Sequence, residues 1–97
     1  MRRDFATTLP DRQRHLEAAW HEVIENDWNA EGRDAAYRAA HSLAGAAETF
    51  GFSDIGQAAR ALNDTLHEFQ ALTSVTPDQQ TAAEILYAKV LAAFGRI

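Results

Sequence analysis

Apolar residues recur along this chain at the three-residue and four-residue spacings of amphipathic helices. The pattern runs from Pro10 to about Asp27, from about Arg33 to Phe50, and through two further segments that follow Ser53 and Thr76. The apolar positions are Leu16, Trp20, Val23 and Ile24; Ala36, Ala39, Ala40, Leu43, Ala46, Ala47 and Phe50; Ile55, Ala58, Ala59, Leu62, Leu66 and Phe69; and Ala83, Leu86, Val90, Ala93, Phe94 and Ile97. Four helices are therefore predicted.

Capping residues mark the ends of these segments. Gly51 is expected to end the second helix, because glycine readily takes the left-handed conformation of a C-terminal cap. Ser53 is expected to cap the third helix. Thr76 and Pro77, followed by Gln79, predict a capping box at the start of the fourth.

Four such helices joined by short connections favour an all-α fold, an antiparallel four-helix bundle. The heavy use of alanine, with only 5 Gly and 2 Pro, agrees with this fold class. The first ten residues, which include Phe5 and Leu9, are expected to add a short N-terminal helix or lead-in. We expect a single domain over residues 1–97, since no internal repeat or low-complexity tract is visible.

Composition narrows the possible functions. A chain of 97 residues can bury one core but no deep internal active site, so any chemistry is expected near the surface. The absence of cysteine excludes disulfides and thiolate metal sites. The formal charge is −5 and the arginines are scattered, which argues against a nucleic-acid partner. The sequence has no long apolar run and no leader-like N-terminus, so we expect no membrane association and a cytoplasmic location. We also expect the protein to be a monomer.

The second predicted helix carries a lone histidine, His41, within the stretch AAHSLAGAAETFGF. At about 100° per residue, its apolar positions lie within roughly 60° of Leu43, whereas His41 lies about 160° away. His41 is therefore expected to face solvent. Its neighbours on the exposed face are Asp34, Tyr37, Arg38, Ala44, Gly45 and Glu48.

Small residues follow His41 by three and four positions, where a side chain would normally crowd the imidazole. Glycine inside a helix costs about 1 kcal/mol relative to alanine, so Gly45 is a poor choice on propensity alone. An exposed imidazole is a usable nucleophile near pH 7 and can hold a phosphoryl group as a phosphoramidate. The pattern favours a histidine kept open to a large partner; the alternative is a helix that simply has small surface residues.

The run AHSLAGAAETFGFSDIGQAARALN, residues 40–63, resembles the histidine-containing phosphotransfer (HPt) domains, whose signature is A-H-x-L-K-G. The resemblance implies that His41 is phosphorylated, with Nε2 as the accepting atom. It also implies that Gly45 lets a receiver domain dock beside the histidine and that an amide at Asn63 hydrogen-bonds and orients the ring. Leu43 and Phe50 would occupy buried positions and Gly51 the turn.

One departure concerns charge. The lysine that the family usually places three residues after the histidine is Ala44 here. Arg38 from the same helix or Arg60 from the next could take its place. Without such a substitute, the alternative is a degenerate module that binds a receiver or kinase without carrying phosphate.

The resemblance implies a phosphocarrier in two-component signalling, not an enzyme with kinase activity of its own. It would accept a phosphoryl group from a receiver-domain aspartate, or from a kinase, and pass it to another receiver. The partners would be response-regulator receiver domains and hybrid histidine kinases. No cofactor of its own is expected, because the Mg²⁺ would lie in the partner receiver. The second class of function is a helical interaction module with no phosphochemistry.

The 4 His of the chain raise the question of a metal site. The pairs His21-Glu22 and His67-Glu68 begin like a zinc-protease motif but lack the second histidine four residues later. Asp64 and His67 would project away from the third apolar stripe, whereas the ligands of a di-iron bundle point inward. We therefore expect no metal site.

Overall fold

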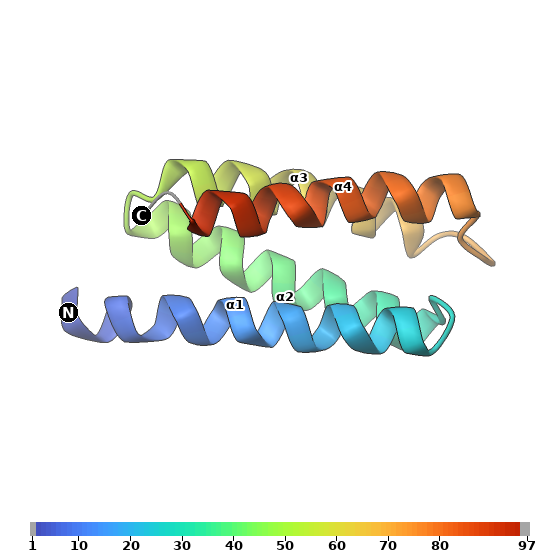
Figure 1. Ribbon diagram of the computed structural model, residues 1–97, viewed down its shortest axis with the longest axis horizontal. Helices are drawn as coiled ribbons and strands as arrows, with labels where there is room; N and C mark the ends of the chain where they lie inside the picture. The colour runs from blue at the N-terminus through green and yellow to red at the C-terminus, as the bar shows by residue number, and fades with distance from the viewer. Residues whose placement is uncertain (1, 96–97) are drawn as a thin grey trace.

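The chain folds into four α-helices in a computed structural model that describes the backbone of residues 2–95 and the side chains of residues 9–95. The helices are α1 (Arg2–Glu25), α2 (Ala30–Thr49), α3 (Ser53–Phe69) and α4 (Pro77–Phe94). No strand occurs within the described backbone. Successive helices run in opposite directions, so both ends of the chain lie at the same end of the molecule (Figure 1). The predicted all-α four-helix bundle is confirmed.

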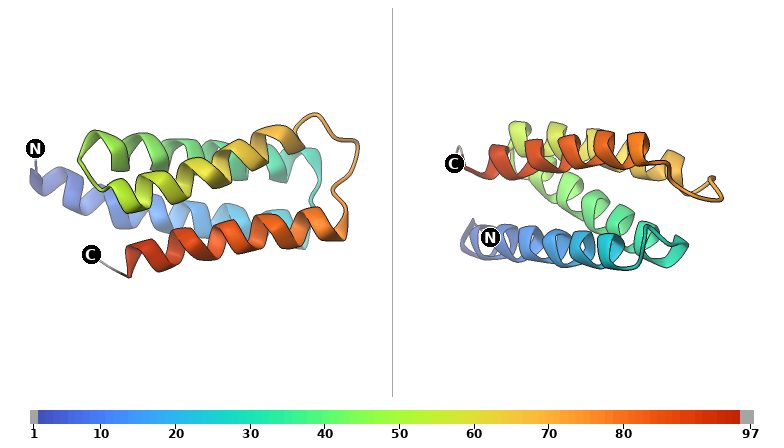
Figure 2. Two further views of the ribbon diagram at one scale, coloured as in Figure 1. Left: turned by 90° about the horizontal axis from the view of Figure 1, so that it is seen from above. Right: turned by 45° about the vertical axis from the view of Figure 1, so that its right-hand side comes forward.

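Helix α2 is the central element of the packing. It packs against both α1 and α3, and α3 in turn packs against α4. The second view of Figure 2 shows α2 running obliquely between α1 and the pair formed by α3 and α4. Because α2 has neighbours on two sides, it can bury a wide arc of its surface, and its solvent-facing strip is correspondingly narrow.

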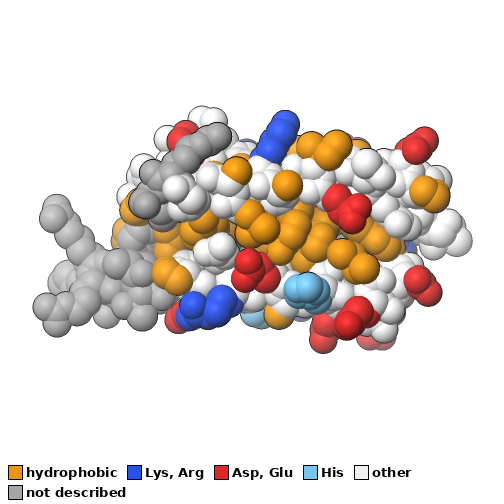
Figure 3. Space-filling model, viewed as in Figure 1, with side chains coloured by type: hydrophobic (Ala, Val, Ile, Leu, Met, Phe, Trp, Pro, Cys, Tyr) orange, Lys and Arg blue, Asp and Glu red, His pale blue; other side chains and the backbone are white. Residues whose placement is uncertain are grey.

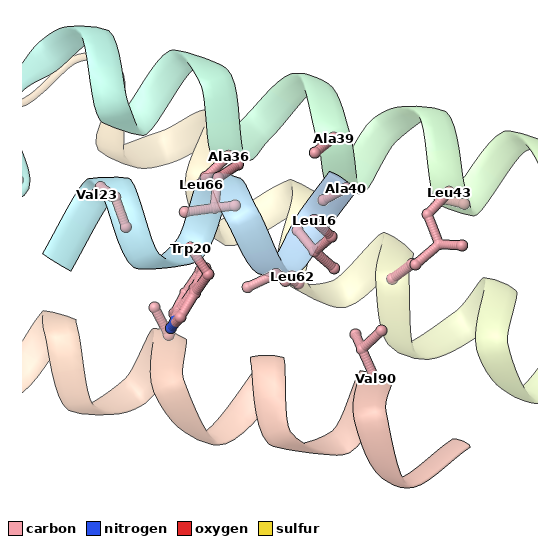
Figure 4. Packing of buried hydrophobic residues seen from close by; sticks show 14 of the residues in the cluster. Leu16, Trp20, Val23, Ala36, Ala39, Ala40, Leu43, Leu62, Leu66 and Val90 are labelled. Atoms are coloured by element: carbon pink, nitrogen blue, oxygen red, sulfur yellow. The ribbon is translucent and has the colours of Figure 1, made fainter. Parts of the chain in front are cut away.

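Small residues of α2 let its neighbours approach closely. Its buried alanines include Ala36 and Ala40, which lie near larger apolar side chains of the other helices (Figure 4). The largest fully buried side chains are Leu16, Val23, Leu43, Ile55, Leu62, Leu66 and Val90. Each of these belongs to one of the predicted apolar stripes.

For two residues, the assignment to a buried apolar stripe is wrong. Ile24 is 44% exposed and Phe50 is 49% exposed. The buried arc of α1 includes Leu16, Trp20 and Val23, and Ile24 lies beyond its edge. Phe50 is the C-cap residue of α2, where the backbone leaves the helix and the side chain no longer follows its stripe. The predicted packing of Phe5 and Ile97 lies outside the described side chains.

The expected separate N-terminal segment is also absent, because α1 runs continuously through Pro10. Proline within a helix removes one backbone hydrogen bond and usually bends or ends the helix. Here Leu9 is buried in the core and holds the turn at the proline against the bundle. The free energy gained by burying Leu9 outweighs the tendency of Pro10 to end the helix.

The turn between α1 and α2 has an unusual backbone. Asp27 and Trp28 take φ angles of 56° and 58°, in the left-handed region that side chains other than glycine rarely adopt. The indole of Trp28 is buried edge-on against Trp20, with ring centroids 5.4 Å apart. Burying this large ring offsets the backbone strain.

Helix α2 begins three residues earlier than the predicted Arg33. Asn29 is its N-cap, and its side chain accepts a hydrogen bond from the backbone N–H of Gly32 at 2.8 Å. A Cβ at Gly32 would lie 3.1 Å from the Cα of Val23. Glycine at this position therefore allows the first turn of α2 to lie against α1.

The remaining caps are partly as predicted. Gly51 adopts a φ of 85° in the turn after α2. Phe52, and not Ser53, holds the N-cap position of α3, and it makes no side-chain capping bond. The capping box of α4 is confirmed, since Thr76 and Gln79 exchange two hydrogen bonds of 2.8 Å and 3.2 Å.

Helices α1 and α4 meet through aromatic side chains. Trp20 and Tyr87 stack with ring centroids 4.5 Å apart and nearly parallel planes. Figure 3 shows a strip of apolar side chains along the seam between the two helices. Among the described helices, none is long and apolar enough to cross a lipid bilayer.

Candidate functional site

His41 lies in the middle of α2 with its side chain exposed to solvent. Ala40 and Leu43, on the opposite side of the helix, are fully buried. The orientation predicted from the helical register is therefore correct. Among the described residues, no group forms a hydrogen bond or ion pair with the imidazole. Within residues 9–95, the ring nitrogens are therefore not engaged by another side chain.

A small hollow of about 100 Å³ lies beside His41, where α2 meets α3. Its lining consists of His41, Ala44, Gly45, Glu48, Arg60 and Asn63. The structure thus brings residues predicted from two separate helices into one site. Pockets that enclose small molecules usually measure 300 Å³ or more, so this hollow is too small to hold a substrate by itself. A reacting group must therefore be presented here by a larger partner.

Gly45 leaves one side of this site open. A Cβ at this position would meet no atom within 4 Å, so neither packing nor backbone geometry requires glycine there. A glycine inside a helix nevertheless costs about 1 kcal/mol relative to alanine. The free chain gives no structural reason for Gly45, which points to a need for close approach beside His41.

Aromatic contacts hold the other side of the imidazole. The ring of Tyr37, one turn earlier in α2, stacks on His41 with centroids 6.0 Å apart and planes 23° apart. This contact follows from helix geometry, because side chains lean toward the preceding turn. Tyr37 also contacts the ring of His67 from α3, at a centroid distance of 5.6 Å. Tyr37 thus limits the positions that the imidazole can take.

Comparison with known protein families identifies the family of this chain. The family described as the Hpt domain matches residues 1–93. The chain belongs to the Hpt domain family. Hpt domains are phosphocarriers, not enzymes, and they act in two-component signalling with receiver domains and histidine kinases. No curated protein and no solved structure matches this sequence.

The position of Ala44 beside His41 predicted that it lies on the exposed face of α2. This prediction is wrong for this Hpt domain. Ala44 is only 6% exposed and forms part of the floor of the hollow. The reason is that α3 covers the side of α2 on which Ala44 lies, so the buried arc of α2 is wider than its apolar stripe implies. A lysine at this position would have to extend along the junction between α2 and α3 to bring its charge close to His41.

The two arginines predicted to replace the missing lysine are both paired with carboxylates. Arg38 forms an ion pair with Asp34 at 3.0 Å. Arg60 donates two hydrogen bonds to Glu48, one of them from Nε at 2.9 Å. The hydrogen bond and the charge of Glu48 raise the pKa of Arg60 above its ordinary value. The cations that were predicted to face a phosphoryl group are therefore already partly neutralised in this Hpt domain.

Asn63 lines the hollow, but its amide is directed elsewhere than predicted. Its Nδ2 donates to the backbone carbonyl of Tyr37, at 3.4 Å, and not to the imidazole. The side chain therefore acts on the residue that stacks on His41. Any effect of Asn63 on the ring in this free state passes through the position of Tyr37.

Three residues near His41 were not predicted as part of the site. Ser42 directly follows His41 and accepts a hydrogen bond from Arg12 of α1. His67 joins from α3 through Tyr37. Arg12 and His67 are distant in sequence, and only the relative register of the packed helices brings them here. The sequence pattern of a single helix does not determine how that helix is aligned along its neighbours.

The described residues contain no group of three or more histidine, aspartate or glutamate side chains arranged to hold a metal ion. His67, Asp64 and Glu68 are exposed on α3, and His21 and Glu22 are exposed on α1.

Proposed function

We propose that this Hpt domain carries a phosphoryl group on Nε2 of His41 and moves it between receiver domains in a phosphorelay. The observation that supports this most directly is the open environment of His41, an exposed histidine of the central helix whose ring nitrogens have no hydrogen-bond partner among the described residues. Gly45 leaves approach space that the fold does not require. The adjoining hollow is too small for a free substrate and instead suits a reacting group held by another protein.

The chemistry of the transfer needs only a positioned nucleophile from this chain. The lone pair of Nε2 attacks the phosphorus of a receiver's aspartyl phosphate, and the bond between phosphorus and the carboxylate oxygen breaks. The aspartate leaves as a carboxylate while Nδ1 keeps its proton. The reverse step delivers the phosphoryl group to the aspartate of a second receiver. A phosphorylated histidine kinase is the other donor that fits this scheme.

In this scheme the two partners divide the work. The receiver supplies the aspartate, its Mg²⁺ and most of the charge stabilisation during the in-line displacement. This chain supplies a histidine held by Tyr37 and a surface that admits the receiver. It acts without a cofactor of its own, as a monomer in the cytoplasm.

Incubation with a phosphorylated receiver domain tests the proposal. We expect the wild-type chain to gain a label that is lost in acid and stable in alkali, as a phosphoramidate is, and His41→Gln to gain none. His67→Gln is the matched control, because His67 is also exposed and touches the same tyrosine. A label that persists in His41→Gln, or a wild type that no phosphorylated receiver of its organism labels, would contradict the proposal.

A second candidate function rests on Ala44. Without the usual family lysine, the domain could bind a receiver or kinase and carry no phosphate. That function predicts that the wild type and His41→Gln bind the receiver equally well and that neither is labelled. The same labelling experiment, combined with a binding measurement, separates the two functions.

A further inference from the structure

Two arginines, Arg38 and Arg60, lie near His41, and a third, Arg12, contacts the next residue of α2, Ser42; the three differ in how they are paired. Arg38 is bound to Asp34 and Arg60 to Glu48. The third, Arg12, comes from α1 and has no carboxylate partner among the described residues. The arginine that was not predicted is thus the one whose charge is least neutralised.

Arg12 has one hydrogen-bond partner among the described residues, and that partner is uncharged. One terminal nitrogen donates to the hydroxyl of Ser42, the residue directly after His41. Its Nε is buried and is the one such side-chain nitrogen or oxygen within residues 9–95 that has no hydrogen-bond partner. A buried donor left unpaired is unfavourable, so a stronger acceptor would stabilise this side chain.

The surroundings of Arg12 give it room to move. A hollow of about 350 Å³ lies where α1 meets α2. Its lining consists of Asp11, Arg12, His15, Ala39 and Ser42. Asp11, the carboxylate in this lining, is already paired with Arg14. The guanidinium is therefore not fixed by a competing anion.

Gly45 borders the surface of α2 between Ser42 and the imidazole. Gly45 lies four residues after His41 and three after Ser42, so on the helix surface it neighbours both. A side chain at this position would stand between them, but Gly45 has none and the space above it is empty. The space above Gly45 is the route by which the guanidinium would reach the imidazole.

We propose that Arg12 leaves Ser42 and pairs with the phosphoryl oxygens on His41, supplying from α1 the cation that is missing at Ala44. This inference rests on the proposed function of His41 as the phosphoryl carrier. A phosphoryl group brings close to two negative charges and three strong acceptors. Arginine is suited to it, because its planar fork can donate two parallel hydrogen bonds to a phosphate.

A donor that needs no receiver isolates this role from docking. With phosphoramidate, Nε2 of His41 forms a bond to phosphorus while the phosphorus–nitrogen bond of the donor breaks and ammonia leaves. We would measure the fraction of phosphorylated chain and its decay after the donor is removed, by ³¹P NMR, for the wild type and for Arg12→Gln. The control is Lys89→Gln, which removes an exposed cation of α4 and leaves the pairing of Asp11 with Arg14 unchanged.

We expect Arg12→Gln to lower the phosphorylated fraction and shorten its lifetime by about threefold, as for the loss of one partly exposed charged hydrogen bond. Lys89→Gln should match the wild type, and Arg12→Lys should recover most of the loss. The pH titration of the ³¹P signal adds a readout that altered packing does not move. Because a nearby cation favours the dianion, the phosphoryl pKa should be lower in the wild type than in Arg12→Gln.

Equal lifetimes and equal phosphoryl titrations in the wild type and Arg12→Gln would overturn the inference. So would a loss confined to Arg38→Gln or Arg60→Gln. If the wild-type chain takes no phosphoryl group on His41 from phosphoramidate, the proposed function fails as well. That outcome is distinct from one in which His41 is labelled and Arg12 makes no difference.

Discussion

At the scale of single residues, Gly45 carries more information about function than any buried residue. Buried side chains such as Leu43 are explained by packing alone. Gly45 is exposed, its missing Cβ would touch nothing, and helix propensity disfavours it. A residue that weakens the fold without a structural return is best explained by what approaches it from outside.

Substitutions at Gly45 should therefore separate stability from transfer. Gly45→Ala should raise the free energy of unfolding by about 0.5–1 kcal/mol, because alanine is the better helix former and finds open space. Gly45→Gln should fold as well as the wild type yet slow phosphoryl transfer from a receiver. Urea denaturation and transfer rates check both effects.

Phosphorylation by phosphoramidate provides the control for Gly45→Gln, since this small donor does not require a docked protein. We expect its rate to change little. If Gly45→Gln accepts the phosphoryl group from a receiver at the wild-type rate, the space above Gly45 is not used for docking.

At the scale of elements, a buried arginine joins the start of α2 to the end of α3. Arg33 is 4% exposed, and it donates to the carbonyl oxygens of Phe69 at 2.5 Å and Leu72 at 3.1 Å. The C-terminal end of a helix carries partial negative charge and unpaired carbonyls, which a cation stabilises. This contact fixes the position of α3 relative to α2, and hence of Asn63 and Arg60 relative to His41.

Replacing Arg33 should destabilise the whole bundle. We expect Arg33→Met to lower the free energy of unfolding by about 2 kcal/mol, because it leaves buried carbonyl groups without donors. Arg38→Met is the matched control; its side chain is 78% exposed in a surface ion pair and should change stability by about 0.5 kcal/mol or less. Equal effects of the two changes in urea denaturation would contradict this role of Arg33.

The elements themselves were largely predictable, and their ends were less so. Periodicity locates all four helices, and the capping box of Thr76 is local chemistry that the sequence states directly. The helix through Pro10 and the N-cap at Phe52 were mispredicted. In both places tertiary packing overrides a local signal, and a single helix pattern contains no information about its neighbours.

At the scale of the whole molecule, one aromatic stack spans the seam between the first and last helices. Burial raises the pKa of Tyr87 above its ordinary value of 10.0, and the charge of Glu17 adds to the effect. Above pH 10 the unfolded chain loses this proton while the folded chain keeps it. The folded state then binds more protons, so its stability falls as the pH rises further.

This linkage predicts a specific loss of stability in alkali. The free energy of unfolding should decrease above pH 10 in the wild type, and Tyr87→Phe should reduce that decrease while retaining the stack on Trp20. Urea denaturation across pH 9 to 11 provides the comparison. An identical pH dependence in both chains would show that Tyr87 ionises as freely in the folded state as in the unfolded one.

The arrangement of helices also explains which parts of the site the sequence could reveal. His41, Gly45 and Glu48 share one face of one helix, so the register of α2 predicts their proximity. Ala44 was placed wrongly because its burial depends on where α3 lies. Arg12 was missed because its approach to Ser42 depends on how α1 is aligned along α2.

The most direct test of the account is to locate the phosphoryl group by NMR on chain labelled with ¹⁵N in histidine. After incubation with a phosphorylated receiver, we expect a new coupling to phosphorus at Nε2 of His41 alone, with the other three imidazoles unchanged. A phosphoryl group on any other residue, or an unmodified His41 beside a receiver that remains competent, would contradict the claim that His41 is the carrier.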